Sequence, residues 1–407
     1  MSQLLGLRIR NYKSLADISL GQIGFGQGIA LPSLSCFIGP NGSGKSSLLD
    51  AFGFLADCLQ EGVAAACDKP QRGGFAKLRT QNRTGPIRFE LYYRQSRQDR
   101  PTSYIFAVDE VGGLPVVVEE LLRQARKGRT RGRLYPFLKL ENGVGRVWAG
   151  DATEEEEGAT SLPVELADKA RLGITILGQL KEHPRIVGLR SYIESWYLSY
   201  FIPDAARKLP PVGAQKHLDR TGENLGNVVQ YIERSHPERF RRVLREIAEK
   251  IPGILSIETE TSPDGRLLLK FNERGYLTPF YQQSMSDGTL KMFAYLLLLE
   301  DPEPPSFIGI EEPENGLYHK LLENLARELL RHADRSQGTT QVLLTTHSPY
   351  LVDALKPEQV WLMEKDDEGH TQVTRTADMP IIVEMVKEEI PLGSLWYSNH
   401  FEERFGN

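Results

Sequence analysis

The residues best suited to chemistry form a glycine-rich run, Gly39-Pro-Asn-Gly-Ser-Gly-Lys-Ser, that satisfies the pattern G-x-x-x-x-G-K-[ST]. Glycines at these positions let backbone N–H groups turn inward around phosphates, and the helix that follows adds its positive N-terminus. Lys45 is placed to meet the β- and γ-phosphates of ATP, and the Ser46 hydroxyl to ligate Mg²⁺. We expect phosphate binding by Gly39, Pro40, Asn41, Gly42, Ser43, Gly44, Lys45, Ser46 and Ser47.

Two carboxylates follow an apolar run that begins at Phe307. Glu311 and Glu312 stand directly after it, and in α/β nucleotide folds the chemistry lies at the carboxyl ends of strands. Glu311 can hold Mg²⁺ through water, and Glu312 can orient or deprotonate the water that attacks the γ-phosphate. Taken alone, such an acidic pair is more often a solvated loop. The phosphate loop in the same chain favours the catalytic interpretation.

A second apolar strand, 342–345, ends in Thr346 and His347. If the two strands are near neighbours, we expect His347 beside Glu312, where it can hydrogen-bond the γ-phosphate and respond to its loss. An isolated histidine at a strand end is more often structural. In the company of the other motifs, Lys45, Glu312 and His347 become the predicted catalytic residues.

A third motif, Met285-Ser-Asp-Gly-Thr, precedes the apolar run Leu290 to Leu299. Ser286 is predicted to be the N-cap of a helix, Gly288 permits close approach of another backbone, and a helix start of this kind is a second anion site. A helix that is merely capped fits the local sequence equally well. The order of the motifs along the chain favours a contact with nucleotide.

The elements around these motifs predict an α/β fold. Leu5, Leu7 and Ile9 alternate with polar residues as in a half-buried strand, and a second strand, 35–38, runs into the glycine loop and then into an amphipathic helix. Further patterns predict antiparallel strands at 87–93 and 104–108, a hairpin with a turn at 263–265, helices at 290–299 and from 318, and strands at 307–310, 342–345 and 360–363.

Composition narrows the class of protein. With 407 residues, 40% of them hydrophobic and 25% charged, the chain resembles an ordinary globular protein. No apolar run approaches the roughly 20 residues of a membrane span, and the opening lacks the apolar core of a signal peptide, so we expect a cytoplasmic protein without a membrane partner. The net charge of -5 gives no general attraction to nucleic acid. Three cysteines without a C-x-x-C pair are expected to be buried thiols.

Five motifs in this order make the chain similar to the RecF/SMC-like, ABC-type AAA ATPases. They are Asn11-Tyr-Lys-Ser-Leu, the phosphate loop, Met285-Ser-Asp-Gly-Thr, Glu311-Glu-Pro-Glu-Asn-Gly-Leu and Thr346-His-Ser-Pro-Tyr. The group includes the ATPase parts of OLD-family proteins and many bacterial antiphage-defence ATPases. The resemblance covers roughly residues 5–114 and 204–363. It implies ATP and Mg²⁺ as cofactors and a homodimer in which two ATP molecules lie between the subunits.

The resemblance also suggests roles for further residues. Ser286 and Gly288 would complete the phosphate loop of the partner subunit, and Lys13 would contact nucleotide. A glutamine-loop ligand of Mg²⁺ would be Gln71, with Gln81 as the competing position. The chain departs from the family where Glu311 replaces the usual aspartate, which lengthens the carboxylate without removing a ligand. The signature motif also differs from the Leu-Ser-Gly-Gly-Gln of transporters.

We therefore expect an ABC-type P-loop fold with a mixed central sheet, an antiparallel β side-sheet and a helical insertion. The expected parts are an N-terminal half of the ATPase domain at 1–113, a mainly helical insertion or lid at 114–250, a C-terminal half at 251–365 and a tail at 366–407. The end of the tail, 392–397, is more apolar than a free terminus should be, so it either packs on the core or docks a partner.

The expected function is an ATP-hydrolysing dimeric switch that acts on DNA, or with a separately encoded effector, in antiphage defence or genome maintenance. The alternatives are the ATPase subunit of a transporter, disfavoured by the divergent signature, and a nucleotide-binding scaffold that does not hydrolyse, disfavoured by the intact Lys45, Glu312 and His347. A basic run from Arg123 to Arg133 is the candidate DNA contact, although no aromatic residues interleave and a solvated loop fits it as well.

Overall fold

The computed structural model describes residues 2–26, 28–125, 134–149, 161–211, 213, 215–335 and 340–401. The chain forms two compact units: unit 1 comprises Met1–Trp196 and Glu358–Met379, and unit 2 comprises Tyr197–Pro357 and Pro380–Asn407. Each unit therefore combines segments that are distant in the sequence. Among the described residues, no helix combines the length and the apolar character that a membrane span needs.

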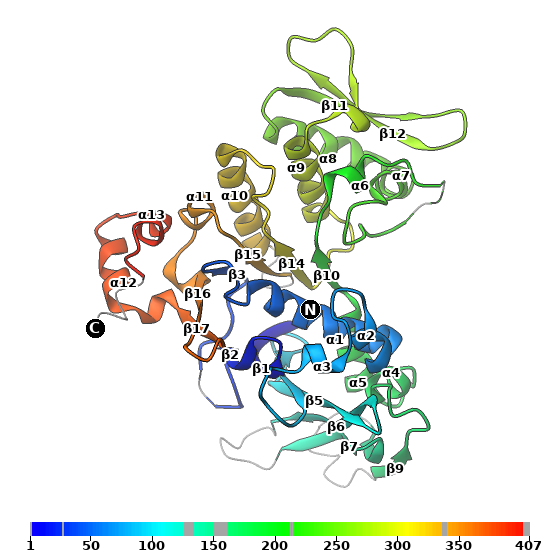
Figure 1. Ribbon diagram of the computed structural model, residues 1–407. Coiled ribbons are helices and arrows are strands. Elements are labelled where there is room, and N and C mark those ends of the chain that lie inside the picture. The colour runs from blue at the N-terminus through cyan, green and yellow to red at the C-terminus, as the bar shows by residue number, and fades with distance from the viewer. Residues whose placement is uncertain are drawn as a thin grey trace. The chain divides into compact units, whose positions relative to one another are not determined.

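Unit 1 is built mainly of strands (Figure 1). Its strands are β1 (Gln3–Tyr12), β2 (Leu15–Gly21), β3 (Leu34–Ile38), β4 (Ile87–Arg94), β5 (Thr102–Val111), β6 (Leu114–Gln124), β7 (Tyr135–Glu141), β8 (Val144–Trp148), β9 (Ser161–Glu165), β16 (Val360–Lys365) and β17 (Thr371–Arg375). Its helices are α1 (Lys45–Glu61), α2 (Val63–Asp68), α3 (Phe75–Leu78), α4 (Gly173–Leu177) and α5 (Pro184–Glu194). The short strand β10 (Trp196–Ser199) contains the boundary between the units.

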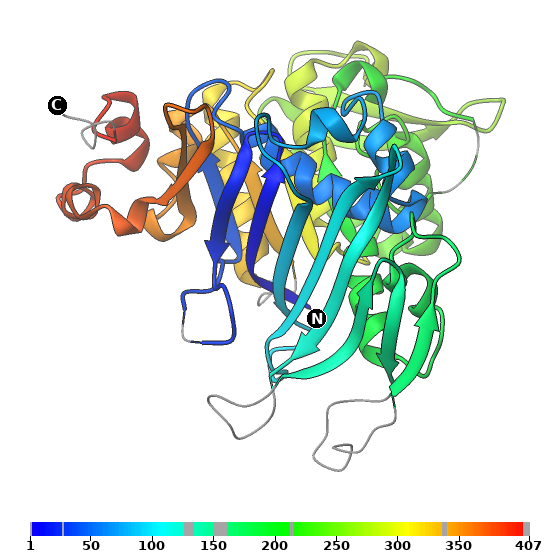
Figure 2. The same cartoon turned by 60° about the horizontal axis from the view of Figure 1, so that its bottom comes forward.

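The described strands of unit 1 include an antiparallel sheet in the order β2-β1-β4-β5-β6-β7-β8-β9, whose long members run side by side in Figure 2. Alternate side chains point to opposite faces. On one face, Phe89 packs against Tyr12 and against Phe54 of α1, so this helix covers the apolar side. The predicted antiparallel side-sheet is confirmed.

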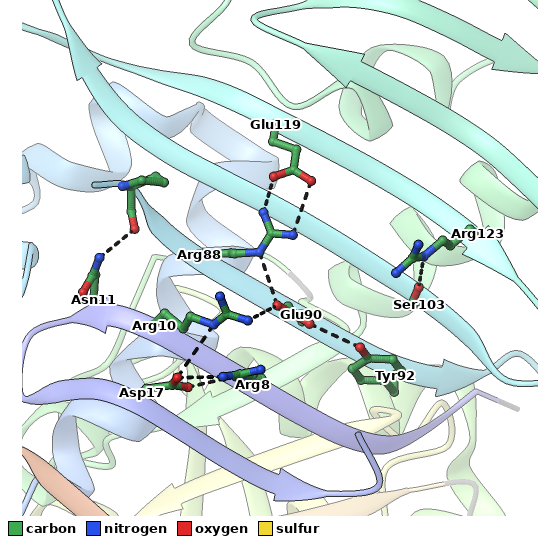
Figure 3. A network of polar contacts seen from close by, with 11 residues as sticks. Arg8, Arg10, Asn11, Asp17, Arg88, Glu90, Tyr92, Ser103, Glu119 and Arg123 are labelled. Atoms are coloured by element: carbon green, nitrogen blue, oxygen red, sulfur yellow. Dashed lines mark hydrogen bonds and ion pairs between the residues drawn. The ribbon is translucent and has the colours of Figure 1, made fainter. Parts of the chain in front are cut away.

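The opposite face of the same sheet is polar. Figure 3 shows Arg10 and Arg88 beside Glu90, whose Oε1 accepts a hydrogen bond from each, while its Oε2 accepts one from the Tyr92 hydroxyl. Arg8 forms a bidentate pair with Asp17 at 2.8 and 2.7 Å. These charges neutralise one another within the sheet, so the face is a network of ion pairs.

Beside this sheet, unit 1 holds the strands that carry the glycine loop. β3 pairs with β16 in parallel and β16 with β17 in antiparallel orientation, so the local sheet is mixed. β3 is buried along its whole length, as expected for a strand covered on both faces. Helix α1 buries Leu48, Phe52, Leu55 and Leu59, which confirms the predicted apolar face.

Unit 2 is mainly helical. Its helices are α6 (Pro203–Ala206), α7 (Leu225–Ser235), α8 (Pro237–Lys250), α9 (Asp287–Leu299), α10 (His319–Arg335), α11 (Pro349–Val352), α12 (Pro380–Lys387) and α13 (Leu392–Tyr397). Its strands are β11 (Ile254–Thr261), β12 (Leu267–Glu273), β13 (Phe280–Tyr281), β14 (Phe307–Glu311) and β15 (Gln341–Thr345). Short 3₁₀ turns occupy Gln282–Ser284, Pro357–Gln359 and Thr376–Asp378 of the chain.

Within unit 2, β14 and β15 pair in parallel, and β11, β12 and β13 form an antiparallel sheet. The predicted hairpin with its turn at 263–265 is confirmed by the pairing of β11 with β12. The apolar tail packs on its own unit, because the backbone N–H of Gly393 in α13 donates to Asp353 at 2.8 Å and Leu392 and Leu395 are buried. All three cysteine side chains are buried, as expected.

The expected insertion at 114–250 is not helical in its first part. Residues from Leu114 to Glu165 contribute β6 to β9, and β6 pairs with β5 from its first residue. In the described part of this range, the first helix begins at Gly173. Position 113 therefore lies inside unit 1 and does not separate two compact units. The acidic run 154–157 and the basic residues from 126 to 133 lie outside the described residues.

Candidate functional site

The glycine loop lies between β3 and α1 in unit 1. Gly39, Gly42 and Gly44 have φ values of 147°, 80° and 107°, a region that glycine alone adopts without cost. A Cβ atom on Gly39 would lie 2.0 Å from the Met363 carbonyl oxygen, so no other residue fits there. At Gly42, in contrast, an added Cβ atom would meet nothing within 4 Å. The backbone thus forms a cradle of the kind that surrounds phosphates.

Lys45 begins α1 and turns its ammonium back into this loop. The side chain is 5% exposed, and its Nζ donates to the carbonyl oxygens of Gly39 at 2.8 Å and Pro40 at 3.0 Å. The next residue, Ser46, is exposed at the first turn of the helix. A glycine loop with positive φ values, a buried lysine held at that loop and an exposed serine fit the triphosphate and the Mg²⁺ that the sequence predicts.

Thr371, on β17, holds the phosphate loop through hydrogen bonds. This role is not predicted from the sequence. Its Oγ1 donates to the Ser43 carbonyl oxygen at 2.8 Å and interacts with the Ser14 hydroxyl at 2.9 Å. Its backbone N–H donates to the Ser14 carbonyl oxygen, also at 2.9 Å. An added Cβ on Gly44 would lie only 2.3 Å from Thr371 Oγ1. This threonine therefore fixes the position of the phosphate loop relative to β17, although hundreds of residues separate the two in the sequence.

Replacing Thr371 with valine should loosen the phosphate loop. The change keeps the shape of the side chain but leaves the Ser43 carbonyl oxygen without this donor, which costs about 1–3 kcal/mol at a buried site. We expect a lower melting temperature and a roughly tenfold loss of ATP affinity, since tenfold corresponds to about 1.4 kcal/mol. Thermal unfolding and a nucleotide titration measure both. Thr371→Ser, which keeps the hydroxyl, is the matched control, and equal affinity for the valine and serine variants would contradict the assignment.

Lys13 is held by a carboxylate of α1. Its Nζ lies 2.7 Å from Asp50 Oδ2, and its backbone has a φ of 50°. Asp50 also accepts hydrogen bonds from the Tyr12 hydroxyl at 2.6 Å and from Arg72, whose side chain is 0% exposed. Burial opposes ionisation of Asp50, but the bonds from Arg72 and Lys13 lower its pKa below the usual value. Lys13 is therefore a fixed cation next to the helix that begins at the loop.

Gln71 lies in an exposed turn between α2 and α3. The neighbouring Arg72 anchors this turn to α1 through ion pairs with Asp50 at 2.9 Å and Asp57 at 2.7 Å. The competing Gln81 is also exposed, in a turn before β4. Both glutamines remain predictions as Mg²⁺ ligands, because neither position has a contact that distinguishes it.

The predicted catalytic carboxylate lies in unit 2, directly after β14. Glu311 is the last residue of the strand, and Glu312 follows it with a φ of 42°, in the left-handed region. Such a conformation costs about 1–3 kcal/mol in a residue other than glycine and persists only where its surroundings enforce it. Here the Glu312 backbone N–H donates to the Thr345 carbonyl oxygen at 3.0 Å, which holds the turn against β15.

His347 and Asn315 hold the Glu312 carboxylate from both sides. His347 Nε2 lies 3.2 Å from Oε1 of Glu312, and Asn315 Nδ2 donates to its Oε2 at 3.0 Å. Glu314 in turn accepts a hydrogen bond from the His347 backbone N–H. Both the Glu312 and His347 side chains are about one-third exposed, so they remain open to a substrate. The expectation that His347 lies beside Glu312 is confirmed, and their catalytic roles remain predictions.

The third motif forms the start of α9, also in unit 2. Ser286 is the N-cap, as predicted, because its Oγ accepts from the Thr289 backbone N–H at 3.2 Å. Arg207 holds the preceding turn through the Met285 carbonyl oxygen at 2.8 Å and through an ion pair with Asp287. An added Cβ on Gly288 would lie 3.0 Å from the Gly316 carbonyl oxygen, so the glycine permits the close approach that the sequence suggests.

The predicted site residues thus fall into two groups, each ordered within its own unit. Unit 1 carries Lys13, Gln71 and the loop from Gly39 to Ser47, and unit 2 carries Ser286, Gly288, Glu311, Glu312 and His347. Among the described residues, no cluster of three or more histidine, cysteine, aspartate or glutamate side chains could hold a metal by itself. A metal at the phosphate loop would accordingly need ligands from the nucleotide and the Ser46 hydroxyl.

Comparison with known proteins agrees with this geometry. Residues 34–353 match the model of a family described as "AAA domain, putative AbiEii toxin, Type IV TA system". No curated protein matches the chain.

Among solved structures, an SMC head bound to the C-terminal winged-helix domain of ScpA has a TM-score of 0.53 and 14% identity, over 91% of this chain and 97% of that one. An SMC head with an extended coiled coil, bound to the C-terminal domain of ScpA derived from Pyrococcus furiosus, has a TM-score of 0.52 and 12% identity, over 95% and 100%. At these identities the likeness shows the fold, which is the predicted ABC-type P-loop ATPase fold.

Proposed function

The chain belongs to the family of AAA domains whose model spans residues 34–353, a family of P-loop ATPase domains, and from this premise we propose that it hydrolyses ATP to ADP and phosphate as a homodimeric switch. The observation that carries the proposal is the Glu312 carboxylate, held by His347 at 3.2 Å and Asn315 at 3.0 Å on a backbone that must be forced into place. A glutamate in an ordinary solvated loop would not have its carboxylate held by two side chains, so these contacts favour a functional role.

Each group has a distinct task in this proposal. The backbone N–H groups of the glycine loop and the Lys45 ammonium bind the β- and γ-phosphates, and Mg²⁺ would be held by the Ser46 hydroxyl directly and by Glu311 through water. When bound, Mg²⁺ neutralises charge that develops on the phosphate oxygens. Glu312 orients the attacking water and accepts its proton, and His347 both steadies that carboxylate and donates to the γ-phosphate. Most of the rate then comes from positioning and charge neutralisation.

Phosphate release by the purified protein tests this function directly. ATP turnover should require Mg²⁺ and cease when EDTA removes it, because the metal shares the phosphate charge with Lys45. Binding without any phosphate release would leave only a nucleotide-binding scaffold.

The dimer is inferred from the exposed start of α9. Ser286 and Asp287 are exposed although they begin a helix whose remaining residues are almost all buried. A positive helix start that faces solvent is suited to an anion. We infer that it meets the γ-phosphate held by a second copy of the chain, so that ATP joins the two subunits.

The family description supports a proposal for the biological setting. Its description names an AbiEii toxin of a type IV toxin–antitoxin system, which favours a defence role with a separately encoded partner protein over a general role in genome maintenance. In this role ATP would close the dimer, a partner or DNA would be recognised in the closed state, and hydrolysis would reset it.

A DNA-dependent switch makes a measurable prediction about the basic run. Duplex DNA should raise ATP turnover, and replacing Arg126, Lys127, Arg129 and Arg131 with alanine should weaken DNA binding. Each lost phosphate contact should reduce the slope of log affinity against log salt by roughly 0.9. Binding titrations at several salt concentrations measure the slope. An unaltered slope would mean that this run is a solvated loop, and a separate protein partner would then be the better hypothesis.

A further inference from the structure

Lys291 is a buried lysine on the second turn of α9, and no motif in the sequence points to it. The residue is 4% exposed. Its Nζ donates to the Asn315 carbonyl oxygen at 2.9 Å and lies 3.5 Å from the Glu312 carbonyl oxygen. Both contacts are with the loop that presents the Glu312 carboxylate. The ammonium therefore reaches from the helix of the third motif to the backbone of the predicted catalytic loop.

Burying the Lys291 ammonium at this position is unfavourable to the free energy of folding. Removing a charge from water is unfavourable unless hydrogen bonds and nearby charges compensate, and an apolar side chain of similar length would pack in a buried helix at lower cost. Burial lowers the pKa of Lys291 below its ordinary value, although Glu314, Glu312 and Asp287 oppose the shift. Methionine would satisfy α9 equally well, since the helix is otherwise lined with leucine and other apolar residues.

The loop, in contrast, needs the contacts that Lys291 supplies. Glu312 has a φ of 42°, its carbonyl oxygen and that of Asn315 both face Lys291 of α9, and the side chains of these two residues hydrogen-bond to each other. Lys291 is a cationic donor within reach of both oxygens, and charged donors make the stronger hydrogen bonds. The orientation of the Glu312 carboxylate thus depends on a residue of a different element.

A second contact joins the same two elements one turn earlier. Gly288 lies against the Gly316 carbonyl oxygen so closely that a Cβ atom would be 3.0 Å from it. Positions 288 and 291 are three residues apart and share one face of the helix. The start of α9 and the loop 312–316 are therefore in contact at two points.

We propose that Lys291 is a positioning residue that couples the nucleotide contact at Ser286 to the orientation of the Glu312 carboxylate. This rests on the proposed function, in which Ser286 meets the γ-phosphate held by the partner. When that phosphate seats the start of α9, Lys291 and Gly288 set the loop, and Glu312 becomes competent in the same subunit. The two nucleotide sites of the dimer are then coupled through each subunit, and hydrolysis does not start before the dimer closes.

The test is Lys291→Met in the full chain, with Lys291→Arg as the matched variant that keeps the charge. For the methionine variant we expect kcat to fall by roughly 100-fold, the size of effect that a misplaced catalytic group produces, with KM changed less than about threefold. The melting temperature should change little, because removing the buried charge offsets the loss of the donor to the Asn315 carbonyl oxygen. The arginine variant should recover most of the lost kcat. Should the methionine variant fail to fold, Lys291→Gln, which keeps an N–H donor without charge, takes its place.

A double variant tests the coupling between Ser286 and Lys291 separately. Ser286→Arg and Lys291→Met interrupt the same connection, so kcat of the double variant should be no lower than that of the more damaged single variant. Multiplicative losses, or a methionine variant with kcat within about twofold of wild type, would overturn the inference. Wild-type protein that releases no phosphate from ATP and Mg²⁺ would instead overturn the proposed function, and the two failures are thereby distinguished.

Discussion

Replacing Glu312 with glutamine should stop ATP turnover while ATP still binds. Glutamine keeps the shape of the side chain and one hydrogen-bonding oxygen, but it cannot accept the proton of the attacking water. General-base catalysis of this kind contributes roughly 10²–10⁴-fold, so we expect kcat to fall by about that factor. Phosphate release measures turnover, and a nucleotide titration measures binding. A variant that retains more than about a tenth of wild-type turnover would show that another group activates the water.

The same variant should accumulate as an ATP-bound dimer, because closure without hydrolysis cannot be reversed. Light scattering with ATP and Mg²⁺ should give the mass of two chains for Glu312→Gln. Adding Ser286→Arg should return a smaller species, since the exposed start of α9 would then carry a bulky side chain where the partner's phosphate must dock. Equal mass for both variants with and without ATP would contradict ATP-gated dimerisation.

Replacing Lys45 with alanine should abolish measurable ATP binding. The Lys45 ammonium lies inside the loop, held by the Gly39 and Pro40 carbonyl oxygens, so its loss removes the charge that meets the phosphates. Truncating one partner of a buried charge pair costs about 2–5 kcal/mol, which predicts an affinity loss of roughly 30-fold to several thousand-fold. A direct titration measures it. Lys139→Ala, at an exposed position on β7, is the control and should bind as wild type does.

Unchanged ATP affinity for Lys45→Ala would contradict the phosphate-loop assignment itself. Together with intact binding in Glu312→Gln, the expected results separate the residues that hold nucleotide from the residue that activates water.

Much of the fold could be predicted wherever the signal is local. The glycine loop is specified by residues that adopt positive φ and by its flanking strand and helix, and the structure has β3 before it and α1 after it. The N-cap at Ser286 and the turn at 263–265 depend likewise on neighbours a few residues away. These features need no knowledge of the rest of the chain.

The strand β6 shows where local reasoning fails. Glu119 and Glu120 interrupt the apolar pattern of this strand, which lies at the start of the region expected to be a helical insertion. In the structure Glu120 points inward and is 1% exposed, accepting hydrogen bonds from the Gly173 and Ile174 backbone N–H groups and the Tyr104 hydroxyl. A carboxylate at the start of α4 is favourable there, but its partner is about fifty residues away in the sequence. Burial raises the pKa of Glu120 above its usual value, and only the fold reveals why.

The residues of the candidate site likewise divide into those that a local sequence signal predicts and those that it does not. Glu312, His347 and Lys45 are predicted because each follows a strand or a motif with its own signal. Thr371 and Lys291 have no such signal, since one is a threonine on a half-exposed strand and the other a lysine within an apolar helix. Their contacts become visible only when distant segments are packed together.

The pairing of β3 with β16 also determines when the sheet next to the phosphate loop can form during synthesis. Cys36 pairs with Val360, so the strand that leads into the phosphate loop waits for its neighbour until more than 300 further residues have been synthesised. Contacts this distant in sequence form slowly, because loop-closure entropy is lost before they stabilise the fold. Tyr197–Pro357 is made in the interval and belongs to the other unit, so most of unit 2 is synthesised before unit 1 is complete. A ribosome stalled before Glu358 would therefore hold a nascent chain that lacks both β16 and the Thr371 hydroxyl, and it could not yet bind nucleotide with full affinity.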